Sequence, residues 1–268
     1  TGGATNFENL EGTLYRTTNI GDTMRGDGID NILSGLTGSD TIYGGAGNDI
    51  LYGDSVVAQG RYPQRVFEAS DNSSEPDDDE LYGNAGNDTL VGTAGNNILD
   101  GGTGADTIVT GDGVDTIIMR SGDGSSTLSL ADIITDFTDG TDVFGLDDGL
   151  SYSELTIAQG SGDYSNDTLV SITSTGEYLA VVQGVGVSQI NYYDYVSTAT
   201  VDQTLLGSAG NDVLLGASGS DSVNTGAGSD IVITYGGNDT ITIDGVGDKV
   251  IDGGTGTNTL TISHGGIS

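Results

Sequence analysis

Aspartate and asparagine side chains return at a fixed interval of nine residues along two stretches of this chain. The first series consists of Asp22, Asn31, Asp40, Asp49, Asp79, Asp88, Asn97, Asp106 and Asp115, with twenty-one residues inserted between Asp49 and Asp79. The second consists of Gln203, Asp212, Asp221, Asp230, Asp239, Asp248 and, after one extra residue, Asn258. Hard divalent cations prefer carboxylate and amide oxygens as ligands, so this spacing predicts repeated metal binding.

The periodic residue occupies the sixth position of a nonapeptide, G-G-x-G-x-D-x-U-x, in which U is a large aliphatic residue. GLTGSDTIY (35–43) and GGAGNDILY (44–52) are two adjacent copies. The glycines permit positive φ and therefore a tight turn, and x-U-x is a short strand whose alternation directs U inward. One repeat should form one turn and one strand, and two repeats a full coil between two parallel sheets.

A large aliphatic residue follows each periodic position by two residues. These residues are Met24, Leu33, Ile42, Leu51, Leu81, Leu90, Leu99, Ile108, Ile117, Leu205, Leu214, Val223, Val232, Ile241, Val250 and Leu260. Two inward rows of them would form a slim core. Stacking would place the carboxylate of one repeat beside that of the repeat two further on. Bare carboxylates repel each other there, whereas a bridging cation would bind the coils together.

The composition also requires a cation. The 268 residues include 47 glycines, 40 acidic residues and 6 Lys or Arg, which gives a formal net charge of −34, and 34% are hydrophobic. With so much like charge and so little apolar surface, the chain is expected to be disordered alone. The charge argues against a nucleic-acid partner, which needs a basic face. No apolar run is long enough to predict a membrane span.

The nonapeptide resembles that of RTX (repeats-in-toxin) proteins, which is a calcium-binding signature. The resemblance covers about residues 22–118 and 203–261. It implies an all-β fold of two right-handed parallel β-rolls, separated by a β-rich intervening or capping unit. It also implies roughly a dozen Ca²⁺ ions between stacked turns. The residues that would share an ion are Asp40 with Asp79, Asp49 with Asp88, Asp88 with Asp106, Asp212 with Asp230, Asp221 with Asp239, and Asp230 with Asp248.

Backbone carbonyls of the turns complete the ligand sets that the resemblance implies. They belong to Gly35, Thr37, Gly44, Ala46, Gly83, Ala85, Gly92, Ala94, Gly101, Thr103, Gly207, Ala209, Gly216 and Ser218. Asn31, Asn97 and Asn258 offer only a neutral oxygen and Gln203 is a doubtful ligand, so sites that use them should be weaker or partly vacant. The resemblance further implies a Gram-negative bacterium and type I secretion.

The repeats divide the chain into five predicted regions. Residues 1–20 read as a lead-in from a preceding region, 21–120 as the first roll, 121–198 as the β-rich unit, 199–263 as the second roll and 264–268 as a truncated end. Residues 56–78 interrupt the first roll at a turn. They are interpreted either as a solvated loop or as a contact arm.

The segment 121–198 loses the nonapeptide phase and alternates as five ordinary strands. They are expected within ADIITDF, TDVFGL, SELTIA, DTLVSITS and EYLAVVQGV. The segment resembles the β-rich units that follow RTX arrays, and it should cover an open roll end. Its Asp132, Asp136 and Asp142 are candidate ligands for one more ion, although surface carboxylates are commoner. Tyr192, Tyr193 and Tyr195 are expected in a core or an interface rather than a ligand box.

The side chains fit no familiar enzyme class. There is no cysteine, a single histidine (His264) and a single lysine (Lys249), and neither G-x-S-x-G nor H-E-x-x-H occurs. We therefore predict a structural, calcium-binding segment of a large secreted bacterial cell-surface protein, an S-layer subunit or an adhesin, that folds on Ca²⁺ outside the cell. Its expected partners are copies of itself in a lattice or rod, or a cell-surface glycan. The alternative is the C-terminal calcium-dependent folding and type I secretion module of an RTX enzyme or toxin.

Overall fold

The computed structural model describes residues 4–5, 21–36, 38–54, 77–200 and 202–263. The chain divides into two compact units, Thr1–Val143 with Thr156–Ile190 and Phe144–Leu155 with Asn191–Ser268. The segment 121–198 therefore contributes to both units. The inserted loop before residue 77, most of the lead-in and His264 lie outside the described residues. Within the described ranges, no helix is long and apolar enough to cross a membrane.

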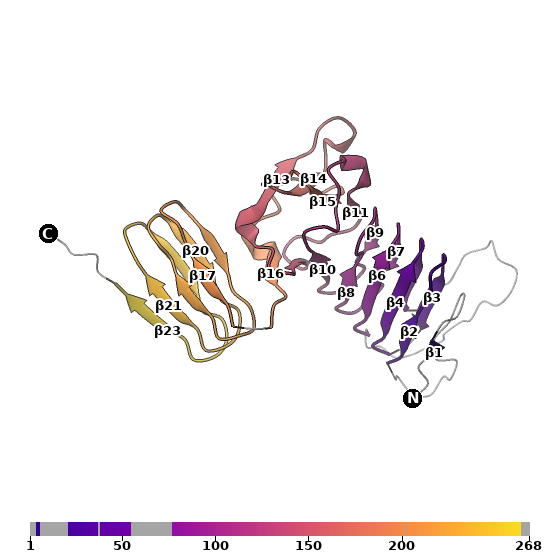
Figure 1. The fold of residues 1–268 in the computed structure, drawn as a ribbon, viewed down its shortest axis with the longest axis horizontal. Helices are drawn as coiled ribbons and strands as arrows, with labels where there is room; N and C mark the ends of the chain where they lie inside the picture. Colours follow the sequence, from indigo (N-terminus) through magenta and orange to yellow (C-terminus); the bar gives the residue numbers. More distant parts are fainter. Residues whose placement is uncertain (1–3, 6–20, 37, 55–76, 201, 264–268) are drawn as a thin grey trace, which may run out of the picture. The chain divides into compact units, whose positions relative to one another are not determined.

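The first unit contains a roll of two parallel sheets between which successive strands alternate (Figure 1). One sheet holds β1 (Ala4–Thr5), β2 (Thr23–Arg25), β4 (Thr41–Ala46), β6 (Glu80–Ala85), β8 (Ile98–Asp100) and β10 (Thr116–Met119). The other holds β3 (Ile32–Leu36), β5 (Ile50–Asp54), β7 (Thr89–Val91), β9 (Thr107–Val109) and β11 (Asp132–Ile134). Each repeat strand pairs with the strand two further on, as two repeats per coil require. Ile42 still pairs with Leu81 across the insertion, which leaves the register of the sheet unchanged.

The core of this roll consists of the aliphatic residues that the sequence predicted. All nine, from Met24 to Ile117, are at most 2% exposed. Their neighbours in each strand face outward, and this alternation gives β5 its pattern of half-buried and buried residues. The prediction of an inward aliphatic two residues after each periodic position is confirmed throughout the first roll.

The far end of this roll is covered by strands without the nonapeptide phase. β11 pairs in parallel with β9 and with β15 (Tyr178–Val182). β14 (Thr168–Ile172) runs antiparallel to β15, and β13 (Leu155–Gln159) completes the sheet. Val170 and Leu179 are buried in this cover. Two 3-10 helices, η1 (Leu128–Leu130) and η3 (Gly162–Tyr164), belong to the same segment.

The second unit contains a tyrosine-rich cluster followed by a roll. β12 (Val143–Leu146) pairs in parallel with β16 (Tyr195–Ser197), flanked by η2 (Tyr152–Glu154) and η4 (Tyr192–Asp194). Tyr195 is fully buried, with its ring 5.0 Å from that of Phe144 and 5.0 Å from that of Tyr152. The expected core role is therefore confirmed for Tyr195, whereas Tyr193 is 59% exposed. With β12, all five strands predicted within 121–198 are present.

The second roll repeats the alternation in fewer coils. One sheet holds β17 (Thr204–Leu206), β19 (Ser222–Asn224), β21 (Thr240–Ile243) and β23 (Thr259–Ile262). The other holds β18 (Val213–Leu215), β20 (Asp230–Ile233) and β22 (Lys249–Asp252). Its buried core is Leu214, Val223, Val232 and Ile241, with Leu205 packed against it. The predicted fold of two parallel β-rolls is confirmed.

In β22, the residue that faces the core lies one position later than the sequence predicted. β20 pairs with β22 so that Val232 lies opposite Ile251, and Ile251 packs against the core. Val250, the residue predicted to face inward, is 52% exposed. The reason is an extra residue between Thr242 and Lys249: Thr242 pairs with the residue 18 positions earlier, whereas Lys249 pairs with the residue 19 positions earlier. Leu260, in the last described strand, is 53% exposed.

Candidate calcium sites

The periodic carboxylates stack in the register that the sequence predicted. Oδ1 of most periodic side chains accepts a hydrogen bond from the backbone N–H of the periodic residue one coil earlier. The N–O distance is 2.7 Å from Asp40 to Asp79, 2.6 Å from Asp49 to Asp88 and 2.7 Å from Asp88 to Asp106. The same bond joins Asp22 to Asp40, Asn31 to Asp49, Asp79 to Asn97, Asn97 to Asp115, Gln203 to Asp221, Asp212 to Asp230, Asp221 to Asp239, and Asp239 to Asn258.

The second carboxylate oxygen defines the candidate site. Several Oδ2 atoms are buried and have no hydrogen-bond partner, although the side chains that carry them are at most 2% exposed. These atoms belong to Asp40, Asp49, Asp79, Asp88, Asp106, Asp115 and Asp239. A buried carboxylate oxygen without a partner is costly, because its hydration is lost and nothing replaces it. Seven repetitions of one orphaned atom indicate a missing cationic partner.

Glycine keeps the space beside each of these oxygens open. A Cβ built on Gly83 would lie 2.5 Å from Asp88 Oδ2 and 2.5 Å from the carbonyl oxygen of Gly101, one coil further on. We call this space between a carboxylate and the next coil's carbonyl a cradle. Other cradles are formed by Asp40 with Gly53, Asp49 with Gly83, Asp79 with Gly92, and Asn31 with Gly44.

Backbone oxygens are needed to complete these sites. Among the described residues, no three His, Cys, Asp or Glu side chains form a metal-binding group. The predicted carbonyl ligands of Gly44, Gly83, Gly92 and Gly101 do line cradles. Thr37 lies outside the described residues, and the carbonyls of Ala85 and Thr103 already accept N–H bonds of 3.0 Å from Gly47 and Gly86. Carboxylate and carbonyl oxygens are the donor set that Ca²⁺ prefers, so the residues present fit the ion.

The electrostatics of the stack also favour a bound cation. Burial raises the pKa of Asp79 to about 8 and that of Asp40 to about 7, and repulsion by the Asp40 carboxylate adds to the shift of Asp79. Burial likewise raises the pKa of Asp106 to about 7 and of Asp88 and Asp115 to about 6. Without a cation, the buried stack disfavours its own ionised form. A divalent ion between neighbouring coils would reverse that preference.

The second roll treats its carboxylates differently. Oδ2 of Asp212 accepts a 2.7 Å bond from the N–H of Ser208, and Oδ2 of Asp221 a 2.8 Å bond from that of Ala217, within their own turns. Asp230 Oδ2 lies 2.5 Å from Lys249 Nζ. Asp248 is exposed, and Lys249 rather than Asp248 lies opposite Asp230 in the sheet. The expected pairing of Asp230 with Asp248 is therefore corrected, because the extra residue precedes Asp248.

The neutral members of the two series occupy the predicted places. Asn31 and Asn97 are 1% exposed, and Asn31 Nδ2 is buried without a partner. Asn258 is exposed in its turn. Gln203 is half-buried and donates through Nε2 to the hydroxyl of Ser197, at 3.2 Å. These amides continue the stack but add no charge to it.

The three aspartates after the first roll extend the stack beyond the repeats. Asp106 N–H donates to Asp132 Oδ1 at 3.0 Å, and Asp115 N–H to Asp142 Oδ1 at 3.2 Å. Thr110 Oγ1 donates to Asp136 Oδ1 and Asp142 Oδ2, at 3.1 and 3.3 Å. Burial raises the pKa of Asp132 well above its usual range, and repulsion by Asp106 adds to the effect.

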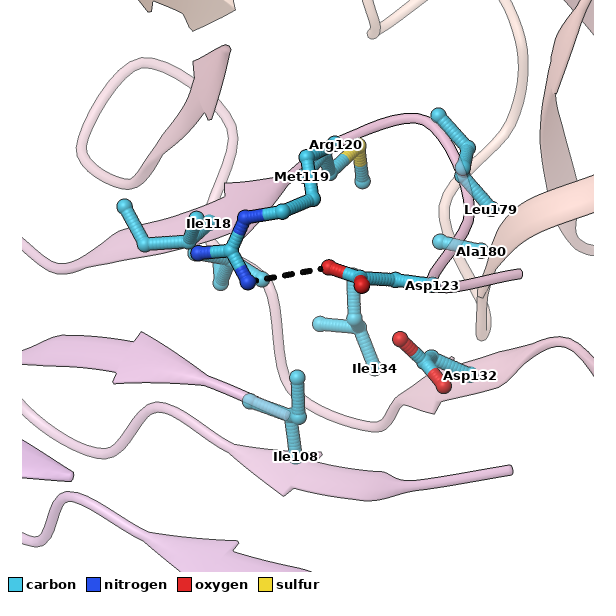
Figure 2. Close-up of a pocket in the computed structure, with 10 residues that line it drawn as sticks. Ile108, Ile118, Met119, Arg120, Asp123, Asp132, Ile134, Leu179 and Ala180 are labelled. Carbon is cyan, nitrogen blue, oxygen red and sulfur yellow. Dashed lines mark hydrogen bonds and ion pairs between the residues drawn. The ribbon is translucent and has the colours of Figure 1, made fainter. Parts of the chain in front are cut away.

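Asp132 borders a small pocket at this end of the roll, shown in Figure 2. Ile108, Ile134 and Leu179 line the pocket, and the Arg120 guanidinium points toward Asp123 at 3.1 Å. Arg120 also pairs with Asp100 at 2.5 Å. These ion pairs neutralise carboxylates near the last coil without a metal.

Sequence reasoning missed a second ladder, at the fifth position of the repeat. Asn87 N–H donates to Asn48 Oδ1 at 2.8 Å, and Asn96 N–H to Asp78 Oδ1 at 2.6 Å. Ser229 N–H donates to Asn211 Oδ1 in the same way. The signal in the sequence was the preference for Asn, Asp or Ser directly before the periodic residue. This ladder joins exposed turns through bonds from backbone N–H groups to side-chain oxygens.

Stacked turns, a slim aliphatic core and orphaned buried carboxylates define a cation-binding parallel β-roll. The profile of the RTX calcium-binding nonapeptide repeat, in four copies, matches residues 25–55, 82–117 and 202–242. The chain therefore contains RTX calcium-binding nonapeptide repeats, which are calcium-binding structural modules.

No curated protein matches the chain. Among solved structures, the chain is similar to the AlgE6R3 subunit from the Azotobacter vinelandii mannuronan C5-epimerase, determined in solution. The two are 23% identical, the match covers 63% of this chain and 78% of that one, and the TM-score is 0.32.

Proposed function

We propose that this chain is a structural segment of a large secreted bacterial surface protein, an S-layer subunit or an adhesin, which folds when it binds Ca²⁺ outside the cell. The observation that carries the calcium-dependent folding is the row of buried Oδ2 atoms without partners. A formal charge of −34 and a core only two rows of aliphatic residues wide leave little else to stabilise the coils.

Calcium would stabilise the stacking of neighbouring coils by binding oxygens from both. Each ion filled at 100 times its dissociation constant adds roughly 2.7 kcal/mol to folding, so one ion for each of the seven orphaned Oδ2 atoms would add roughly 19 kcal/mol. That exceeds the net stability of a typical protein, about 5–15 kcal/mol. In a cytoplasm with micromolar calcium or less, the chain would remain unfolded and ready for export, and it would fold in millimolar calcium outside.

Circular dichroism of metal-free protein, titrated with Ca²⁺ and with Mg²⁺, tests the folding step. We expect β signal to develop with calcium only, because the small Mg²⁺ ion demands a tighter octahedral site. A full β signal and an unchanged melting temperature in excess chelator would overturn the proposal.

The surface role is tested separately. Antibody labelling of intact cells that carry the native gene should stain the cell envelope in calcium and release the protein when calcium is chelated. Recovery in the medium attached to a catalytic domain would favour an enzyme's export module instead.

A further inference from the structure

The only lysine of the chain stands where the repeat should carry its metal-binding aspartate. Gly245 and Gly247 precede Lys249 by the same intervals at which Gly226 and Gly228 precede Asp230. All four glycines have positive φ, 77° and 121° in the later turn and 68° and 114° in the earlier one. The two turns therefore have the same form, and Lys249 is the sixth residue of its repeat.

The ammonium group of Lys249 reaches back into the turn of the preceding coil. Its Nζ lies 2.5 Å from Asp230 Oδ2, 2.6 Å from the carbonyl oxygen of Gly228 and 3.3 Å from that of Gly226. The lysine side chain is 6% exposed and that of Asp230 is 0% exposed. An ammonium group has three protons to donate, and here it meets three oxygens. One carboxylate and two turn carbonyls are also oxygens that a hard cation would use.

Asp230 has a cationic partner, unlike Asp212 and Asp221, whose Oδ2 atoms accept N–H bonds from their own turns. Its Oδ1 accepts the 3.0 Å bond from Asp212 N–H that the stack provides, and its Oδ2 is neutralised by Lys249. At the neighbouring position Asp239, Oδ2 is buried and has no partner. Both oxygens of Asp230 are therefore satisfied by the protein itself.

We propose that Lys249 is a tethered cation that takes the place of one Ca²⁺ in the second roll. Lys249 would then hold the stacked turns 226–230 and 245–249 together without metal. The stacked turns that form the other cradles would still require a calcium ion. The inference rests on the proposed calcium-dependent function, because Lys249 replaces a calcium ion only if the other cradles bind one. A tethered charge cannot dissociate when calcium falls, so this junction would resist chelation.

Counting ions in intact protein by native mass spectrometry at saturating Ca²⁺ tests the substitution. Lys249→Asp should bind one ion more than the wild type, because it restores the sixth-position carboxylate. The matched control is Asp248→Asn, one residue earlier and exposed, which should leave the count unchanged. An equal count for wild type and Lys249→Asp, or the loss of an ion in Asp248→Asn, would overturn the proposal.

A measurement on the wild type keeps the inference testable if Lys249→Asp does not fold. With one lysine in the chain, protein labelled with ¹⁵N-lysine gives a single Nζ resonance. We expect its ammonium protons to exchange slowly and to remain visible at saturating calcium. Their disappearance as calcium binds would show that the ion displaces Lys249. If the wild type bound no calcium at all, the proposed function would fail first.

Discussion

The two rolls are built from one repeat, yet they handle its charge differently. In the first roll, six Oδ2 atoms are buried without a partner, and nine aliphatic side chains form the core beneath them. In the described part of the second roll, one such atom remains, at Asp239. The others are satisfied by turn N–H groups at Asp212 and Asp221 and by Lys249 at Asp230. The nonapeptide motif determines the shape of each coil. The partner of the second carboxylate oxygen, Oδ2, determines how many calcium ions each roll needs.

This comparison predicts a large difference in calcium dependence. One ion per orphaned oxygen, each filled at 100 times its dissociation constant, gives roughly 16 kcal/mol for the first roll and roughly 2.7 kcal/mol for the second. Hydrogen exchange of the full chain, followed through a calcium titration, should therefore show a much steeper dependence in β4–β9 than in β18–β22. Identical calcium dependence in the two sets of strands would contradict the comparison.

Removing one shared carboxylate should affect two coils of the first roll. Asp88 lies between Asp49 and Asp106 in the stack, so its carboxylate would be shared by the calcium sites on both sides. Asp88→Ala should therefore lose about two ions and roughly 5 kcal/mol of calcium-linked stability. Asp139→Ala removes an exposed carboxylate outside the stack and serves as the control. Calorimetric calcium titrations that gave equal losses for the two variants would refute the stacking register.

A single methyl group should close one cradle. Gly83→Ala would insert a Cβ 2.5 Å from both Asp88 Oδ2 and the Gly101 carbonyl oxygen. We expect the variant to lose about one ion. The free energy of unfolding should then fall by roughly 2.7 kcal/mol when calcium stands at 100 times the dissociation constant. Gly28→Ala is the matched control, since its Cβ would meet nothing within 4 Å. Full calcium occupancy in Gly83→Ala, counted by native mass spectrometry, would exclude the cradle as the binding place.

The raised pKa values predict opposite pH responses with and without metal. Burial raises the pKa of Asp40 to about 7 and of Asp79 to about 8, so the metal-free folded roll retains protons that the unfolded chain has released. Residual stability should thus be fully present below about pH 4 and be lost as the pH rises from about 4 to 8. With calcium the roll should instead gain stability, because its ligands must be deprotonated. Circular dichroism of metal-free protein that showed more β signal at pH 8 than at pH 5 would contradict this sign.

The inward-facing aliphatic residues could be predicted from the sequence wherever the nine-residue interval is kept. A turn and a strand per repeat place Leu81 or Ile117 inward wherever the interval is nine, and the structure buries both. The prediction of the inward residue was wrong in β22, where the interval between repeats is ten residues instead of nine. The interval alone does not show whether the extra residue lies before or after Asp248. Gly245 and Gly247 carried that information, since their spacing to Lys249 is that of the turn. The partners of Oδ2 could not be predicted, because they depend on how closely each turn folds back on its own aspartate.

The smallest expected effect tests the corrected phase of β22. Ile251 packs against the four-residue core of the second roll, whereas Val250 is 52% exposed. Ile251→Ala should cost roughly 1–2 kcal/mol, less than the 2–5 kcal/mol of a fully buried isoleucine, because Ile251 is only partly buried. Val250→Ala should change stability by less than about 0.5 kcal/mol, as surface substitutions usually do. Exchange of the β20 and β22 amides at saturating calcium measures both variants in the full chain. A larger loss for Val250→Ala would restore the uncorrected phase, return Asp248 to the carboxylate stack and remove Lys249 from the place of the ion.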